Sequence, residues 1–374
     1  MHLDPTVIGL TSALLLLGIV MVGSASIVLA ARDGDPFYFL ERQLFLAVVG
    51  IFCGALALRV HTDELQRLSY VALGAGLLLL ALVLIPGLGA KVNGSRRWLH
   101  LFGVNFQASE AARVCMLIYL CSYAVRREQE IRTSFVGLLK ALAVLLAAAL
   151  LLLCEPDMGS GVVLLVTGTI VLFLAGARLR DLSIVILAGS ALFAVVAMSS
   201  NYRMQRLKTF LNPWLDPLNQ GYQLIQSEIA IGRGEWIGVG LGASVQKHFY
   251  LPEGHTDFVF AVLAEELGFA GVVLLVVLMG MLAYRALAIA RNAAEAGLKF
   301  QSYLAASFGV WLAVQAFVNM GVNMGLLPTK GLTLPLLSYG RSSLMVTLAW
   351  IGILLRVHHE TQSSRSIPIR GAAR

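Results

Sequence analysis

The chain has 374 residues, of which 58% are hydrophobic and only 13% are charged. A soluble domain carries about 25% charged residues, so this chain has too few polar side chains to cover a surface that faces water. The net charge of +7 resides in basic residues between apolar runs, a pattern typical of membrane proteins rather than of a nucleic-acid-binding patch.

Ten apolar runs are long enough to predict transmembrane helices. In chain order they are Val7–Ala31, Gln43–Leu58, Tyr70–Ile85, Ala108–Val125, Phe135–Cys154, Gly159–Ala177, Leu182–Met198, Asp257–Tyr284, Tyr303–Leu326 and Leu336–Val357. We therefore expect an all-α, polytopic membrane protein in which residues 1–374 form a single ten-helix transmembrane domain. Because basic residues concentrate in one set of connections, we expect both termini and the tail 358–374 to be cytoplasmic.

The connections on the opposite side carry most of the polar chemistry. They are Ala31–Arg42, Pro86–Gln107, Glu155–Asp157, Ser199–Thr256 and Leu327–Pro335. The extracytoplasmic loop 199–256 is too long for a simple connector. No ATP-binding loop, dinucleotide fingerprint or zinc-protease motif occurs, so nothing indicates ATP hydrolysis or a redox cofactor.

This long loop contains a predicted short helix, Gln223–Ala230, followed by the glycine-rich stretch Gly232–Gly242. Glycine lets the backbone approach a ligand closely, although glycine richness is also common in ordinary loops.

A carboxylate follows at the end of the loop. Thr256 is a predicted N-cap, which would place Asp257 in the first turn of the next helix, at the membrane surface. Asp257 could accept a proton, hold a cation or merely cap the helix. His248 and His255 could join it as metal ligands, but the spacing matches no strong metal motif.

Two further carboxylates, Glu265 and Glu266, lie about two turns deeper in the predicted span. Since a carboxylate at membrane depth is costly, each should face a cavity or a cationic partner.

The fourth span begins with Glu110 and Arg113 three residues apart, on one face of the helix. They could form a self-neutralising structural ion pair. Alternatively, Arg113 could bind phosphate together with Arg96 and Arg97 of the preceding loop, and Arg42 could join them from the mouth of the second span.

The segment Leu327–Ser343 contains prolines and glycines that interrupt helix geometry at membrane depth, which is tolerated where backbone lines a cavity. Lys330 adds a cation. Four residues add hydroxyl groups: Ser338, Tyr339, Ser342 and Ser343. These residues predict a polar cavity that accommodates anions.

Here the chain resembles the SEDS family (shape, elongation, division and sporulation). The segment Pro328–Gly340 followed by Ser342 and Ser343 is similar to the family signature, most of all in the FtsW-like cell-division branch, which is related to RodA. Three more motifs agree and occur in order: Asn93–Trp98, Gln107–Arg113 and Gly254–Gly268.

The resemblance implies a peptidoglycan glycosyltransferase that polymerises lipid II into glycan strands at the outer face of the bacterial cytoplasmic (inner) membrane, at the division septum. It also implies a class B penicillin-binding protein (FtsI-like) and the division proteins FtsQ, FtsL and FtsB as partners. A lipid II flippase and a scaffold that recruits the penicillin-binding protein remain as alternatives.

Carried over to this sequence, the family's essential aspartate falls on Asp257, which we expect to act as the general base that deprotonates the acceptor sugar hydroxyl. The departing diphosphate needs cations, directly or with a divalent ion such as Mg²⁺ or Mn²⁺. The cationic candidates are Arg42, Arg96, Arg113 and Lys330. The other expected substrate contacts are Trp98, Glu110, Ser338, Tyr339, Ser342 and Ser343.

The chain departs from the family pattern at three positions. Arg113 stands where lysine is common, Glu155 where a Gln-Pro-Asp turn is common, and Arg341 where glycine is common. The first keeps the charge, whereas the other two weaken the carry-over for the Glu155–Asp157 turn and for the last motif.

Overall fold

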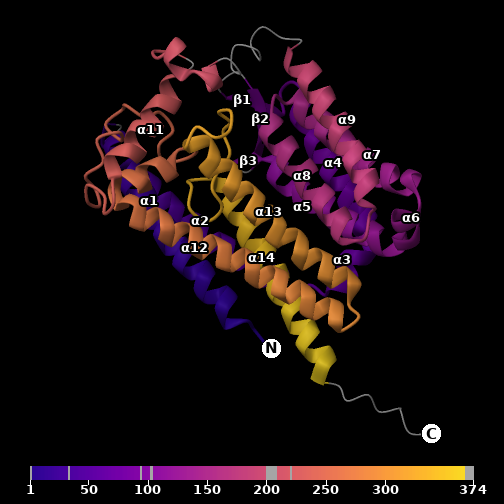
Figure 1. Ribbon diagram of the computed structural model, residues 1–374. Coiled ribbons are helices and arrows are strands. Elements are labelled where there is room, and N and C mark those ends of the chain that lie inside the picture. Colours follow the sequence, from indigo (N-terminus) through magenta and orange to yellow (C-terminus); the bar gives the residue numbers. More distant parts are fainter. Residues whose placement is uncertain are drawn as a thin grey trace, which may run out of the picture.

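The computed structural model describes residues 2–32, 34–92, 95–101, 104–198, 209–219 and 221–366. Most of them are helical (Figure 1). In chain order the helices are α1 (Pro5–Arg32), α2 (Tyr38–Arg59), α3 (Thr62–Arg67), α4 (Ser69–Leu84), α5 (Ala108–Arg126), α6 (Glu128–Thr133), α7 (Phe135–Cys154), α8 (Met158–Leu174), α9 (Leu179–Met198), η1 (Pro213–Leu215), α11 (Tyr222–Gly234), α12 (Val259–Glu295), α13 (Lys299–Asn323) and α14 (Arg341–Ser366). The strands are β1 (Gly89–Val92), β2 (Ser95–Leu101) and β3 (Val104–Gln107).

Each of the ten predicted spans corresponds to one of these helices, so the chain is a multi-pass, mainly helical membrane protein. Within the described residues, seven helices are long and apolar enough to cross a membrane, and α4 and α8 are shorter apolar helices. The helix α9, with 20 residues, matches the remaining predicted span.

Several helix ends differ from the predicted boundaries. α12 begins at Val259 rather than Asp257 and continues to Glu295 rather than Tyr284. α14 begins at Arg341 rather than Leu336, and α2 begins at Tyr38 rather than Gln43. α14 also continues to Ser366, so the described part of the predicted tail 358–374 is helical, whereas residues 367–374 lie outside the described residues.

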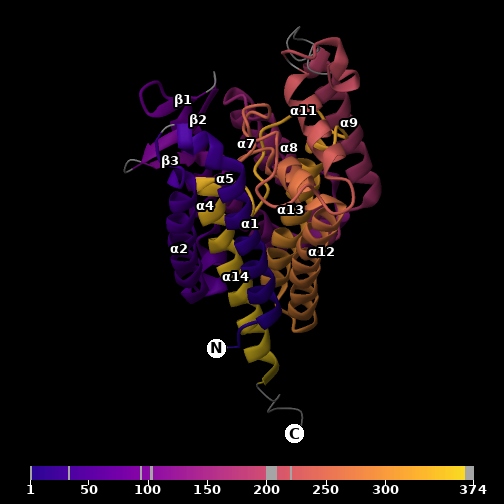
Figure 2. The same ribbon diagram turned by 90° about the vertical axis from the view of Figure 1, so that its left-hand side faces the viewer.

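The two ends of the helical bundle differ. The N-terminal end of α1 and the C-terminal end of α14 lie at one end, and the strands and α11 lie at the other (Figures 1 and 2). We call the latter the sheet end.

Small residues bring the helices close together, as is common in membranes, where lipid tails are as apolar as leucine. α2 crosses α14 where Gly54 meets Gly352: a side chain at Gly352 would collide with the Gly54 carbonyl. Gly18 of α1 likewise leaves room for the backbone of Leu336, in the irregular segment before α14.

A three-stranded antiparallel sheet lies within the predicted loop Pro86–Gln107. β1 pairs with β2 and β2 with β3, with Trp98 opposite Gln107. β3 then leads directly into α5, so the sheet fixes residues 96–98 relative to the start of that helix.

The predicted helix Gln223–Ala230 is confirmed as part of α11, which is longer at its C-terminal end. The glycine-rich stretch after it packs against α12 at Gly268, where the helix is interrupted by a positive φ of 65°. There Val239 and Gly240 donate backbone hydrogen bonds to the carbonyls of Glu265 and Glu266, at 3.0 and 3.1 Å. Close backbone packing therefore accounts for the glycines at this position.

Glu265 and Glu266 are fully buried and have cationic neighbours, as expected. Lys247 Nζ lies 3.2 Å from Glu266 Oε1, and an Arg233 nitrogen lies 3.8 Å from Glu265 Oε1. Ser24 of α1 also donates to Glu266, at 2.6 Å. The two carboxylates thus hold the long loop against α1 and α12.

Candidate active site

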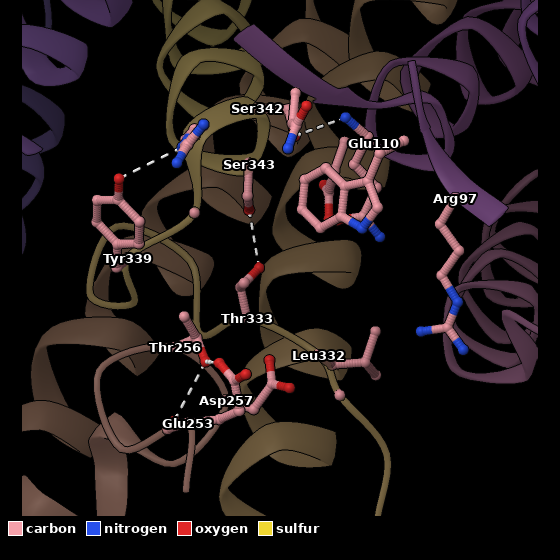
Figure 3. A pocket seen from close by; sticks show the side chains of 16 residues that line it. Arg97, Glu110, Glu253, Thr256, Asp257, Leu332, Thr333, Tyr339, Ser342 and Ser343 are labelled. Atoms are coloured by element: carbon pink, nitrogen blue, oxygen red, sulfur yellow. Dashed lines mark hydrogen bonds between the residues drawn. The ribbon is translucent and has the colours of Figure 1, made fainter. Parts of the chain in front are cut away.

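A polar cavity of about 310 Å³ lies where the sheet, the loop before α12 and the segment before α14 converge (Figure 3). It is lined by Arg97, Trp98, Asn105, Gln107, Glu110, Glu253, Thr256, Asp257, Gly331, Leu332, Thr333, Tyr339, Gly340, Arg341, Ser342 and Ser343. Six of the predicted site residues are therefore brought together: Trp98, Glu110, Asp257, Tyr339, Ser342 and Ser343.

Asp257 lies before α12 and not in its first turn. The N-cap position is Phe258, and Thr256 does not cap the helix: its hydroxyl donates instead to Glu253 Oε2, at 2.7 Å. The N-cap prediction for Thr256 was therefore wrong, and the helix N-terminus does not position Asp257 in the expected way.

Two asparagines of α13 hold the backbone of Asp257. Asn319 and Asn323 both donate to the Asp257 carbonyl, at 3.0 and 3.1 Å. Asn319 also donates to the carbonyl of Leu332, at 2.5 Å, and so joins the loop before α12 to the segment before α14. Sequence reasoning missed this pair, although two asparagines four residues apart in an apolar span are a signal that could have revealed it.

Gly331 makes room for the carboxylate. A Cβ atom added at Gly331 would lie 2.5 Å from Asp257 Oδ2, closer than two such atoms can approach. The Asp257 side chain can therefore take this position only because residue 331 is glycine.

The surroundings of Asp257 raise the pKa of its carboxyl to about 7. Burial is the main cause, and the negative charge of Glu253 adds to it, whereas the positive charge of Arg97 opposes it. Near neutral pH this carboxyl can both accept and release a proton, as a general base requires.

Arg97 and Arg341 are the basic residues among the described residues that line the cavity. Arg97 extends from β2 and donates to the Pro156 carbonyl, at 2.5 Å. Arg341 Nε donates to the Tyr339 hydroxyl, at 3.3 Å. From the sequence, Arg97 is a possible phosphate ligand together with Arg96, whereas Arg341 is only a departure from the family pattern.

The four candidate cations do not line the cavity. Arg42 stacks over the Tyr38 ring, with its guanidinium carbon 4.1 Å from the centroid, and Arg96 is likewise not part of the cavity wall. Lys330 Nζ lies 3.6 Å from the Met158 sulfur. The substrate-binding role of these residues stays a prediction.

Arg113 belongs to a buried cluster behind the cavity. It donates to Gln315 Oε1 at 2.5 Å, lies 3.4 Å from Glu110 Oε2, and lies over the Trp311 ring. Glu110 itself lines the cavity. Its ion pair with Arg113 agrees with the alternative that these two residues form a self-neutralising structural pair.

The serines differ in their surroundings. Ser342 accepts a hydrogen bond from the Gln107 backbone at 3.1 Å, and Ser343 accepts one from the Thr333 hydroxyl at 3.0 Å. Ser338, which is not part of the cavity wall, accepts one from the Leu334 backbone at 2.8 Å and so stabilises the segment before α14. Its contact with substrate stays a prediction.

The turn between α7 and α8 lies next to Arg97. Asp157 caps α8 through Ser160 and accepts a hydrogen bond from Ser109 at 3.2 Å. Glu155 is fully buried, and neither of its oxygens has a hydrogen-bond partner in the part of the chain that the structure describes. Burial, together with the charge of Asp157, raises the pKa of Glu155 to about 8.

Within the described ranges, no three histidine, cysteine, aspartate or glutamate side chains gather in a way that could hold a metal ion. His255 packs instead between two rings, 4.6 Å from Phe39 and 5.7 Å from Tyr339. Its backbone carbonyl accepts a hydrogen bond from the Tyr339 amide, at 2.9 Å.

Comparison with known proteins places the chain in a family. Residues 5–363 match the FtsW, RodA and SpoVE family, described as cell cycle proteins. The chain belongs to this family. Its relatives include a protein of Thioalkalivibrio sulfidiphilus named probable peptidoglycan glycosyltransferase FtsW, 53% identical over 94% of this chain and 88% of the relative. A protein of the same name from Nitrosococcus halophilus is 51% identical over 96% and 93%.

Solved structures of family members have the same fold. A chain from a peptidoglycan synthase complex, described in terms of the coordination of polymerization and crosslinking, has a TM-score of 0.79 and 35% identity, covering 96% of this chain and 99% of its own length. The rod shape determining protein RodA of Thermus thermophilus has a TM-score of 0.71 and 31% identity, covering 96% and 98%.

Proposed function

We propose that the chain is a peptidoglycan glycosyltransferase that polymerises lipid II into glycan strands during septal cell-wall synthesis. The observation that carries this proposal is the carboxyl of Asp257, with its pKa raised to about 7, in a cavity that also contains Arg97 and Arg341. The names of the relatives from Thioalkalivibrio sulfidiphilus and Nitrosococcus halophilus give independent support.

In this reaction Asp257 takes the proton from the acceptor sugar hydroxyl as that oxygen attacks the anomeric carbon of the donor. The bond from that carbon to the diphosphate breaks, and the electron pair leaves with the diphosphate. Arg97 and Arg341 supply positive charge for the diphosphates of the two substrates.

A divalent cation, Mg²⁺ or Mn²⁺, remains part of the proposal. The carboxylate of Glu253 lines the cavity beside Asp257 and would be the ligand, since Mg²⁺ typically binds one or two carboxylates together with substrate phosphates. The donor set therefore fits an ion that arrives with the diphosphate, which it would help to neutralise.

The proposed setting is the bacterial inner membrane at the division septum, with both termini in the cytoplasm. The basic connections support this orientation, which places the sheet end and the cavity at the outer face. A class B penicillin-binding protein (FtsI-like) and FtsQ, FtsL and FtsB are the proposed partners. The related synthase complex, which joins polymerization to crosslinking, supports the first of them.

The flippase alternative is disfavoured because alternating access needs binding groups that can be reached from both faces of the membrane. The residues that line the cavity belong to the sheet, the start of α5, the loop before α12, the segment before α14 and the start of α14. These segments lie at the sheet end (Figure 1). The scaffold alternative needs no carboxylate in a polar cavity. Substitution of Asp257 therefore distinguishes the glycosyltransferase from the two alternatives.

The test is a reconstitution of the full chain with its cross-linking partner and fluorescent lipid II. We expect glycan polymer from the wild type and none from Asp257→Asn, with complex formation unchanged. Lipid translocation across vesicles without polymer would favour the flippase. Complex formation without either activity would favour the scaffold.

A further inference from the structure

The two arginines of the cavity belong to different walls. Arg97 comes from β2, and Arg341 is the first residue of α14. Figure 3 shows Arg97 and Tyr339 on opposite sides of the pocket. Because Arg341 Nε donates to the Tyr339 hydroxyl, Arg341 belongs to the Tyr339 side. The cavity thus has two separate positions where an anion would meet a guanidinium.

Arg341 lies at the N-terminal end of α14, where a positive charge without an anionic partner is unfavourable. The N-terminal end of a helix carries partial positive charge, and α14 is a helix of 26 residues. Within the described residues no carboxylate forms an ion pair with Arg341, and its one hydrogen bond uses a single donor of the five that a guanidinium has. An anion in the cavity would satisfy both the side chain and the helix end.

Arg97 differs because it lines the same cavity as Asp257 and its positive charge opposes the rise in the pKa of that carboxyl. The hydroxyl that Asp257 deprotonates attacks the same carbon from which the donor diphosphate departs. A cation near Asp257 is therefore suited to the departing diphosphate. The acceptor also carries a diphosphate, which is separated from the attacking hydroxyl by the acceptor's own sugars and stays attached throughout.

We propose that Arg341, with the Tyr339 hydroxyl and the first turn of α14, binds the diphosphate of the acceptor, while Arg97 faces the diphosphate of the donor. This assignment rests on the proposed glycosyltransferase function and adds to it the separation of the two substrates.

The two arginines then have different kinetic roles. The acceptor diphosphate has the same charge before and during bond formation, so Arg341 stabilises the bound substrate and the transition state alike. Its loss raises the KM for the acceptor about 10- to 100-fold, the range for a lost hydrogen bond to a charged group. The donor diphosphate gains charge as its bond breaks, so loss of Arg97 mainly lowers kcat.

The experiment separates donor from acceptor with a lipid-linked disaccharide that is capped at its attacking hydroxyl and can act only as donor. With this donor saturating, unmodified lipid II is varied as acceptor, and full-length wild type, Arg341→Gly, Arg341→Lys and Arg97→Ala are compared. We expect a raised acceptor KM in Arg341→Gly, a smaller rise in Arg341→Lys and a lowered kcat in Arg97→Ala. An unchanged acceptor KM in Arg341→Gly would overturn the assignment.

A binding measurement tests the subsite without catalysis. Polyprenyl diphosphate alone is titrated into the reconstituted chain. We expect two equivalents to bind to the wild type, and one of the two to bind about 10- to 100-fold more weakly to Arg341→Gly. Arg291→Ala is the matched control. It removes an exposed arginine near the C-terminal end of α12, the end far from the cavity, and should bind like the wild type. Equal binding by Arg341→Gly and wild type would refute the subsite. Two-site binding without polymer from any variant would instead contradict the glycosyltransferase function.

Discussion

Substitution of Gly331 would move the Asp257 carboxylate without changing its charge. The backbone of Gly331 does not have the positive φ that only glycine adopts readily, so alanine fits the local conformation. Its Cβ would lie 2.5 Å from Asp257 Oδ2, whereas ordinary contacts begin at 3.4 Å, so the carboxylate must withdraw by roughly 1 Å. A displacement of that size lowers a rate by about 100-fold, and we expect this loss for Gly331→Ala.

The assay is single-turnover polymerisation of fluorescent lipid II, with the unfolding temperature measured in parallel. The unfolding temperature should change little, because the displaced group is the end of a side chain that faces a cavity. Gly232→Ala in α11 is the control, since a Cβ there meets nothing within 4 Å and the rate should stay at the wild-type value. A Gly331→Ala variant that is folded and polymerises within threefold of wild type would refute the positional argument.

Two further substitutions test the buried charges. Burial raises the pKa of Glu155 to about 8, above the value of about 4.3 in an unfolded chain, so the folded state loses stability as the pH rises between these values. Glu155→Gln should abolish this loss, and equal falls in unfolding temperature between pH 6 and pH 8.5 for variant and wild type would contradict it. Lys247→Met leaves Glu266 buried without its cation and should lower the free energy of unfolding by about 3–5 kcal/mol, measured by denaturation in detergent. An unchanged stability would show that the remaining donors, the Ser24 hydroxyl and the Ser244 amide, satisfy this carboxylate without Lys247.

Hydropathy predicted the spans because the signal is local and strong: each membrane crossing requires about 20 apolar residues in succession. The helix ends were harder to predict, because they depend on contacts between distant segments. α14 begins only at Arg341, since the preceding residues pack against α1 at Gly18 and accept hydrogen bonds from Asn319. No spacing rule within the segment reveals such contacts.

The same limit applies to the site. Asp257 could be identified from its motif, but its position is set by Asn319 and Asn323, more than sixty residues further along the chain. The sequence predicts no strand at Arg96 and Arg97. Only the sheet shows that Arg97 and not Arg96 lines the cavity, because neighbouring residues of a strand face opposite sides. The Glu110–Arg113 pair, by contrast, followed from helical spacing alone.

The pH dependence of polymerisation tests the central claim, that Asp257 is the general base, most directly. Asp257 acts without its proton, and its pKa is raised to about 7. The rate should therefore rise with pH, reach half its maximum near pH 7 and level off at higher pH. Glu253→Gln removes a charge that raises this pKa, so the midpoint should move to lower pH. A rate that is independent of pH between about 5.5 and 8.5, or a midpoint unmoved in Glu253→Gln, would contradict the assignment.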